Sequence, residues 1–146
     1  MPQGPQLDVY LTFTQGRCAE AMRFYEKTLG GKLNQTFTYG SAPPAPGFTV
    51  PPGAEKRVMH TSMQLGDRVL MASDALPGHP GPAMQGFSLS LNYPSVDEAR
   101  RVFGVLAEGG EVHMPIAETF WAEAFGMLVD RFGTPWMVSG PGKPMG

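Results

Sequence analysis

The sequence contains two copies of one pattern. Residues 11–22 read LTFTQGRCAEAM and residues 89–100 read LSLNYPSVDEAR. At an offset of 78 residues the copies share leucine, glutamate and alanine positions: Leu11 with Leu89, Glu20 with Glu98, and Ala21 with Ala99. Each copy then reaches a pair of glycines. A duplication of this kind builds a fold from two similar halves, and binding sites tend to form where such halves meet.

The spacing of apolar residues predicts a strand followed by a helix in each copy. From Val9 to Thr14 apolar and polar residues alternate, as in a strand with one covered face. Over residues 17–29 the apolar positions take a helical spacing, and Gly30 or Gly31 supplies a left-handed cap. The second copy repeats this with a strand at 87–92 and a helix at 96–107, which Ser95–Glu98 opens as a capping box.

Strand-like runs follow each predicted helix, so each copy is a β-α-β-β-β unit. They cover residues 32–39, 57–65 and 68–73 in the first copy, and 111–114, 126–130 and 135–139 in the second. Gly66-Asp67 and residues 131–133 are typical of hairpin turns. Residues 41–53 contain five prolines and predict a long loop.

These elements predict an α+β fold in which eight strands form curved, mainly antiparallel sheets with the helices outside. The length of 146 residues suits a single domain over 1–146. Within it we expect the repeats at 7–74 and 87–140, joined by a Pro- and Gly-rich linker at 75–86.

Composition excludes several classes of function. A formal net charge of −2 and a pI near 5.9 leave no basic patch for nucleic acid. No apolar run is long enough to span a bilayer, and the N-terminus lacks the pattern of a signal peptide. The single cysteine, Cys18, rules out an internal disulfide and suits a reducing cytoplasm, on the buried side of the first helix. We therefore expect a cytoplasmic protein.

The strand side that faces away from the helix is polar in both copies. Tyr10 and Thr12 lie on this side of the first strand, and Ser88 and Ser90 take the matching places in the second copy. A sheet covered by helices on one face can curl so that its other face lines a cavity. We therefore expect a ligand cavity lined by both repeats.

His60 is the histidine of most interest, because it shares a predicted strand face with Ser62. It can be a hydrogen-bonded structural histidine, a pocket-lining polar group that acts as a base or donor, or a metal ligand. His79 lies in the linker and His113 just before Met114-Pro115, and neither has the spacing of a local metal motif.

Other candidate residues divide between core and site. Trp136 suits the core of a closing strand, whereas Trp121, in a short segment after Pro115, suits either a pocket wall or the core. Ten methionines add adaptable lining wherever they reach a pocket. Asp74 and Asp130 each close a strand and are interpreted as turn or cap carboxylates.

The sequence resembles, in a series of short motifs, the vicinal-oxygen-chelate superfamily, which includes glyoxalase I, extradiol dioxygenases and bleomycin-resistance proteins. Within this superfamily it is most similar to the PhnB-like branch. The stretches that carry the resemblance in the first copy are Tyr10-Leu11-x-Phe13, Glu20-Ala21-Met22-x-Phe24-Tyr25, Leu29-Gly30-Gly31, Thr38-Tyr39-Gly40, Val58-Met59-His60 and Leu70-Met71-x-Ser73-Asp74. In the second copy they are Phe87-Ser88-Leu89-Ser90, Phe120-Trp121-Ala122, Phe125-Gly126-Met127 and Asp130-Arg131-Phe132-Gly133-x-x-Trp136-Met137. The resemblance implies the tandem β-α-β-β-β fold and a homodimer.

The resemblance also implies where a metal would bind. Metal enzymes of the superfamily take one ligand from the first strand and one from the last strand of each copy, positions that fall within about a residue of Tyr10, Leu70, Ser88 and Met137. None of these four is a good ligand for a divalent metal. The PhnB-like branch has also been labelled a ubiquinone-pathway methyltransferase, but no glycine-rich loop follows a strand here to hold S-adenosylmethionine.

Three functions follow as hypotheses. The first is a small-molecule binder without metal or other cofactor. The second is a lyase or dioxygenase-type enzyme, metal-dependent through other ligands or metal-free through His60. The third is a structural or regulatory dimer. The predicted ligand-binding residues are Tyr10, Thr12, His60, Ser62, Ser88, Ser90, Trp121 and Met137.

Overall fold

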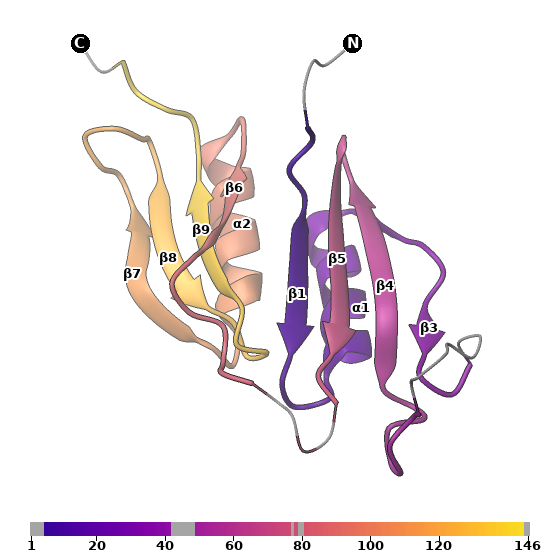
Figure 1. The fold of residues 1–146 in the computed structure, drawn as a ribbon. Coiled ribbons are helices and arrows are strands. Elements are labelled where there is room, and N and C mark those ends of the chain that lie inside the picture. The colour runs from indigo at the N-terminus through magenta and orange to yellow at the C-terminus, as the bar shows by residue number, and fades with distance from the viewer. Residues whose placement is uncertain (1–4, 42–48, 77, 79–80, 145–146) are drawn as a thin grey trace. The chain divides into compact units, whose positions relative to one another are not determined.

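The computed structural model describes residues 5–41, 49–76, 78 and 81–144. The chain forms two compact units, Met1–Pro82 and Ala83–Gly146, and each contains one copy of the repeat (Figure 1). The boundary between the units lies within the segment 75–86 that the sequence marks as a linker. No helix among the described residues is both long and apolar enough to cross a membrane.

The first unit is a sheet with one helix on one of its faces. Its elements are β1 (Val9–Phe13), α1 (Cys18–Leu29), β2 (Lys32–Leu33), β3 (Phe37–Thr38), β4 (Val58–Leu65) and β5 (Arg68–Asp74). The strand order is β1-β5-β4-β2, and β3 also pairs with β4. The β1–β5 ladder is parallel, whereas the other ladders are antiparallel.

The second unit repeats this arrangement. Its elements are β6 (Leu89–Asn92), α2 (Val96–Ala107), β7 (Glu111–Ala117), β8 (Phe125–Val129) and β9 (Pro135–Ser139). The strand order is β6-β9-β8-β7, with β6 parallel to β9 and the other ladders antiparallel. The predicted α+β class, both helices and the hairpin turns are therefore confirmed.

The predicted continuous strand over residues 32–39 is wrong. Two short strands, β2 and β3, stand in its place, so the described chain has nine strands rather than eight. Residues 34–36 between them are polar, and two of them bond to β4 in other ways: Asn34 donates its N–H to the Ser62 carbonyl (2.8 Å), and the Thr36 and Thr61 hydroxyls form a hydrogen bond of 2.8 Å. The ladder of β3 with β4 also shifts register between Phe37 and Thr38.

Two other boundaries differ from the prediction by more than one residue. Strand β6 begins at Leu89, so Ser88 precedes it instead of lying within it, and β7 continues to Ala117 across register shifts. Of the predicted proline-rich loop 41–53, residues 42–48 lie outside the described part, as does His79 of the linker.

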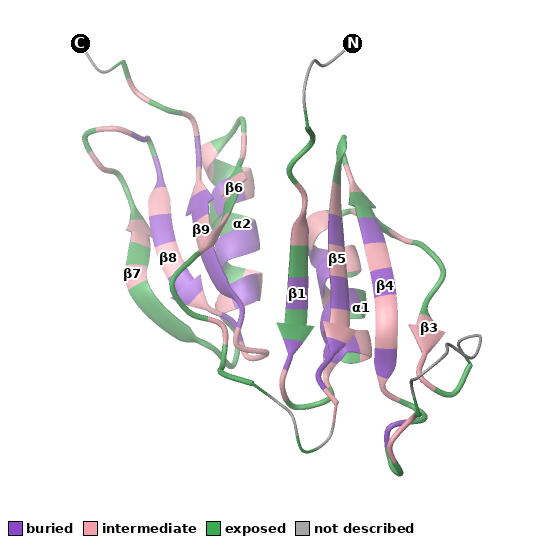
Figure 2. Ribbon diagram, viewed as in Figure 1, coloured by how far each residue is buried: buried purple, intermediate pink, exposed green. Residues whose placement is uncertain are grey.

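The core of each unit lies between its helix and the adjacent face of its sheet (Figure 2). In the first unit the alternation of β1 points Leu11 and Phe13 inward, where they are 1% and 2% exposed. In the second unit Trp136 is 2% exposed and belongs to the core. Burying an apolar side chain of this size contributes about 1.5–3 kcal/mol. The other large buried apolar side chains include Met22, Tyr25, Met63, Val102, Leu106, Leu128 and Val138.

Side chains cap the N-terminus of each helix, and a glycine ends the first helix. The Ser95 hydroxyl accepts a hydrogen bond from the N–H of Glu98, as expected of an N-cap. Gly30 ends α1 in the left-handed conformation, with φ of 76°. The N-terminus of α1 has no cap from Arg17; instead the Asp74 carboxylate, at the end of β5, accepts from the N–H of Cys18 (2.9 Å).

Candidate functional site

The first unit leaves one face of its sheet open. Helix α1 covers the other face, so alternate residues of β1, β4 and β5 point away from the core. The open-face residues of these strands and of β3 are Tyr10, Thr12, Phe37, His60, Ser62, Gln64, Val69, Met71 and Ser73. This set includes four of the predicted ligand-binding residues: Tyr10, Thr12, His60 and Ser62.

Tyr10 and His60 form a hydrogen-bonded pair on this face. The Tyr10 hydroxyl lies 3.1 Å from His60 Nδ1. The two ring centroids are 5.6 Å apart and the ring planes differ by 33°. Tyr10 is 48% exposed although it lies within a strand, and His60 is half-buried. The pair therefore presents a phenol and an imidazole to solvent from a rigid sheet.

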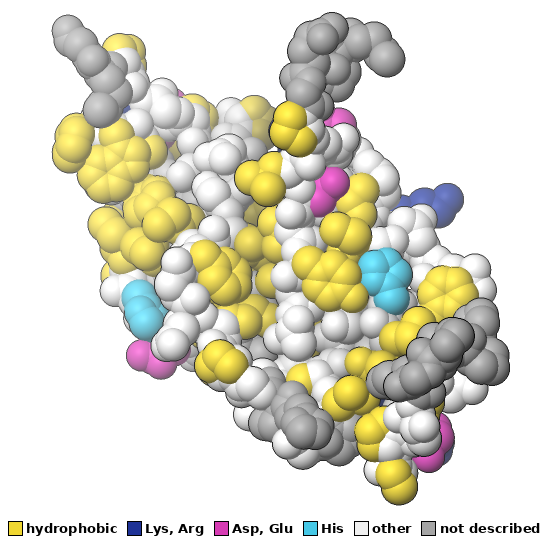
Figure 3. All heavy atoms as spheres, in the orientation of Figure 1, with side chains coloured by type: hydrophobic (Ala, Val, Ile, Leu, Met, Phe, Trp, Pro, Cys, Tyr) yellow, Lys and Arg dark blue, Asp and Glu magenta, His cyan; other side chains and the backbone are white. Residues whose placement is uncertain are grey.

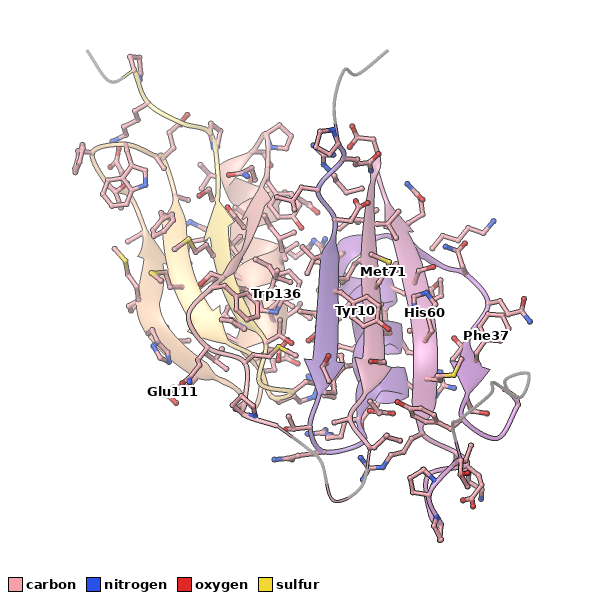
Figure 4. The ribbon with its side chains drawn as sticks, viewed as in Figure 1. Tyr10, Phe37, His60, Met71, Glu111 and Trp136 are labelled. Atoms are coloured by element: carbon pink, nitrogen blue, oxygen red, sulfur yellow. The ribbon has the colours of Figure 1, made fainter. Side chains whose placement is uncertain are left out.

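Apolar side chains surround the pair. Met71 is the cross-strand partner of Tyr10, and Phe37 is the partner of His60. Figure 4 shows Tyr10, Met71, His60 and Phe37 on this face, and in Figure 3 hydrophobic side chains gather around a histidine over β5 and β4. Phe37 and Met71 were not predicted as site residues. Met71 follows Leu70, the metal-ligand position that the resemblance implied, and the alternation of the strand places the two residues on opposite faces. That alternation could have identified Met71.

Thr12 and Ser62 have different surroundings. Thr12 is exposed beside its partner Ser73. The Ser62 hydroxyl accepts a hydrogen bond of 3.0 Å from the Asn34 side-chain amide, and its carbonyl binds the Asn34 N–H. Ser62 therefore helps to attach the β2–β3 segment to β4, whereas Thr12 makes no such bridge.

Beneath this face, Asp74 at the end of β5 joins neighbouring elements through hydrogen bonds. Its carboxylate accepts from the N–H groups of Cys18 on α1 (2.9 Å) and of Val58 on β4 (2.8 Å). The Tyr39 hydroxyl donates to the Asp74 carbonyl (3.1 Å), and burial, followed by the nearby Tyr10 and Asp74 charges, raises the pKa of Tyr39. Arg57 donates to the Ala75 carbonyl at 2.9 Å. The bonds to the Asp74 carboxylate fix α1 and β4 relative to β5.

The second unit holds the other four predicted residues. Ser90 pairs with Met137, which pairs in turn with Met127 on β8. Trp121 is half-buried, and its ring contacts the rings of Phe120 and Phe125 at centroid distances of 4.8 and 5.3 Å. Ser88 is half-buried just before β6. Phe120 is 75% exposed. This face is thus richer in methionine and aromatic rings than in hydroxyls.

The four positions implied for a metal do not fit one. Leu70 carries no donor atom and is only 6% exposed on the core side, and Tyr10, Ser88 and Met137 offer only neutral oxygens and one thioether. Among the described residues no three side chains of histidine, cysteine, aspartate or glutamate form a group that could hold a metal ion. We therefore derive no chemical step through a metal at these positions.

Comparison with known proteins identifies the family. The family model for the Glyoxalase/Bleomycin resistance protein/Dioxygenase superfamily matches residues 9–138. Protein YjdN of Escherichia coli (strain K12) is 34% identical over 145 residues, which cover 95% of each chain.

Two solved structures are similar over nearly their whole length. Protein PA1353 from Pseudomonas aeruginosa is 42% identical with a TM-score of 0.85, and the match covers 94% of this chain and 98% of that one. The PhnB protein from Bacillus cereus, which carries the name 3-demethylubiquinone-9 3-methyltransferase, is 25% identical with a TM-score of 0.77, over 93% and 99% of the two chains. The chain therefore belongs to the Glyoxalase/Bleomycin resistance protein/Dioxygenase superfamily, in its PhnB-like branch.

Proposed function

We propose that this protein binds a small organic molecule on the open face of its first unit, without a metal ion. The observation that carries the proposal is the exposed Tyr10–His60 pair, joined at 3.1 Å on a face whose other side already holds the core. The single buried Cys18 supports action in a reducing compartment, and we place the protein in the cytoplasm.

The chemistry of the face supports binding. Small-molecule sites combine apolar and aromatic walls with a few polar groups that fix orientation. Here Met71 and Phe37 supply apolar surface, and the pair supplies a donor and an acceptor. His60 Nε2 makes no hydrogen bond to a described residue, so it remains available to a ligand.

The test combines metal analysis with a ligand screen. We expect protein purified without added metal to contain substoichiometric zinc, iron and manganese, and its melting temperature to rise with at least one compound of a small-molecule library, because a ligand that binds only the folded state stabilises it. His60→Gln should reduce that rise, whereas His113→Gln, an exposed histidine of the second unit, should not. Stoichiometric metal, or a ligand response that survives His60→Gln, would contradict the proposal.

A metal-free enzyme is the second candidate, and the same pair favours it. A phenol hydrogen-bonded to an imidazole can pass a proton to or from a bound substrate. The ligand found in the screen decides between the two functions: the enzyme converts it, as followed by proton NMR over hours, and Tyr10→Phe abolishes the conversion while retaining binding. A ligand recovered unchanged supports binding alone.

A further inference from the structure

The Tyr10–His60 pair spans three strands of the first unit. Tyr10 lies on β1 and His60 on β4, with β5 between them. Strands are about 4.8 Å apart, so the two backbones are separated by roughly 10 Å. The hydrogen bond of 3.1 Å can therefore form only if the Tyr10 side chain extends across β5 instead of standing upright on the sheet.

This geometry makes a broad aromatic surface. The hydrogen bond holds the two rings beside each other, with their centroids 5.6 Å apart and their planes tilted by 33°. One side of the Tyr10 ring faces β5, where Met71 is its partner, and the ring is still 48% exposed (Figure 4). We call Tyr10 and His60 together the aromatic platform.

The open face around the platform lacks cationic side chains. None of the nine open-face residues named above is lysine, arginine, aspartate or glutamate. A face that bound phosphates or carboxylates would need cationic or oriented N–H donors. The acidic Asp8, which accepts from the Val69 N–H at 3.1 Å, lies two residues before Tyr10 in the sequence and also disfavours an anion.

We infer that the aromatic platform selects a planar aromatic ligand of at least two fused rings that carries no negative charge. This inference rests on the proposed function and names the ligand class for the same site. Such a ligand covers both rings at once, and stacking of planar π-systems stabilises the complex beyond the area buried. A hydroxyl or carbonyl on its rim reaches the Tyr10 oxygen or His60 Nε2.

Two probes of matched outline test the ligand class. We expect 2-naphthol to bind at least tenfold more tightly than decahydro-2-naphthol, which has the same ring connectivity and hydroxyl but is not planar. Calorimetry gives both affinities, and proton NMR should show upfield shifts of the naphthol signals from the ring currents of the platform.

Variants locate the binding. Tyr10→Leu should weaken 2-naphthol binding about tenfold, and Tyr10→Phe less than threefold, because stacking depends on the ring more than on the hydroxyl. His60→Ala removes the other ring and should also weaken binding severalfold. Phe24→Leu, on α1, is the matched aromatic control and should leave affinity unchanged. Circular dichroism checks that each variant is folded.

The outcomes separate this inference from the proposed function. If decahydro-2-naphthol binds as tightly as 2-naphthol and Tyr10→Leu weakens both, the planar class is wrong while the site stands. If neither probe binds but a library compound responds to His60→Gln, the class is again wrong and the site stands. If 2-naphthol binds equally to Tyr10→Leu and His60→Ala, both the platform and the proposed site are wrong.

Discussion

At the residue scale, the Asp74 carboxylate has a larger part in the first unit than its place at a strand end suggests. It is 2% exposed and accepts hydrogen bonds from N–H groups of two other elements. A buried carboxylate is tolerated only when such donors replace the water it loses. In the second unit Asp130 is 3% exposed and accepts from the Trp136 indole and from the N–H groups of Phe132 and Thr134.

We predict that Asp74→Asn destabilises the first unit. The amide keeps the shape of the side chain, but its NH₂ cannot accept the N–H of Cys18 or Val58, so one buried donor loses its partner. The cost is about 1–3 kcal/mol in the free energy of unfolding, measured by urea denaturation. Asp67→Asn in the exposed β4–β5 turn is the control and should change it by less than about 0.5 kcal/mol. Equal effects of the two changes would refute this account of Asp74.

We predict that Cys18 makes the folded state less stable at alkaline pH. Burial, together with the Asp74 charge, raises the pKa of the Cys18 thiol from 9.0 to about 12. Between these values the unfolded chain releases the thiol proton and the folded chain keeps it, so stability falls as pH rises. The linkage amounts to about 2 kcal/mol between pH 8.5 and pH 10.5.

The check is urea denaturation of wild type and Cys18→Ala at pH 8.5 and pH 10.5. Groups that titrate in both proteins, such as Tyr39 and Tyr93, whose pKa values burial also raises, affect both alike. The variant should therefore lose about 2 kcal/mol less than wild type over this interval. Parallel losses in the two proteins would show that the thiol does not titrate differently in the folded state.

For single residues, the sequence could predict the sheet face on which a side chain lies but not its long-range partner. The strand alternation was enough to place Tyr10, Thr12, His60 and Ser62 on one face. It could not show that Tyr10 reaches His60, because that bond depends on β5 lying between β1 and β4. Asp74 was interpreted as a turn or cap carboxylate, but a cap supplied 56 residues away in sequence leaves no local pattern.

At the scale of elements, the last hairpins of the two copies differ in length by one residue, so the copies do not align residue by residue along their whole length. Six residues separate the buried partners Met63 and Leu70, whereas seven separate Leu128 and Trp136. When the copies are aligned at their turn glycines, the last strand of one copy is therefore shifted by one residue relative to the last strand of the other. A shift of one residue places every side chain of that strand on the opposite face of the sheet. This is why Leu70 is buried while Met137, aligned with it, lies on the half-exposed side.

Two glycines near α2 give opposite predictions for the same substitution. A Cβ on Gly110, at the entrance to β7, would overlap the Val129 carbonyl oxygen and lie 2.9 Å from Asp130 Cα, and neither backbone atom can move aside cheaply. Gly110→Ala should cost about 1–3 kcal/mol. Gly104 lies exposed within α2 with no atom within 4 Å of such a Cβ, so Gly104→Ala should stabilise by about 1 kcal/mol.

Thermal and urea denaturation of the two alanine variants measure both effects. The pair is informative because helix propensity alone would make both substitutions favourable or neutral. A Gly110→Ala protein as stable as wild type would mean that the β7 entrance moves away from β8 without cost. A destabilised Gly104→Ala protein would mean that this side of α2 is covered in solution.

At the scale of the whole molecule, the sequence repeat was the feature from which the fold could be predicted. Each copy folds into its own compact unit, with the predicted helix on one face of the predicted sheet. The pairing of the first strand with the last one in each unit, parallel in both, is a long-range choice that no local period encodes. The prediction of a ligand cavity lined by both repeats stays a prediction.

We also predict that the chain forms a homodimer. Strand β7 is an edge of its sheet with β8 as its partner, and Val112 on it is 43% exposed. Exposed edges and apolar side chains of this kind favour association with another chain unless something covers them. Sedimentation equilibrium at micromolar concentration should therefore give about twice the chain mass of 15.7 kDa.

A substitution at this edge tests which surface holds the dimer. Val112→Lys places a charge on β7, and edge charges oppose pairing, so the dissociation constant of the dimer should rise at least tenfold while the circular dichroism spectrum stays unchanged. Glu123→Lys, an exposed change before β8, is the control and should leave it unaltered. A wild-type mass of one chain would refute the dimer, and a Val112→Lys dimer of unchanged affinity would move the interface away from β7.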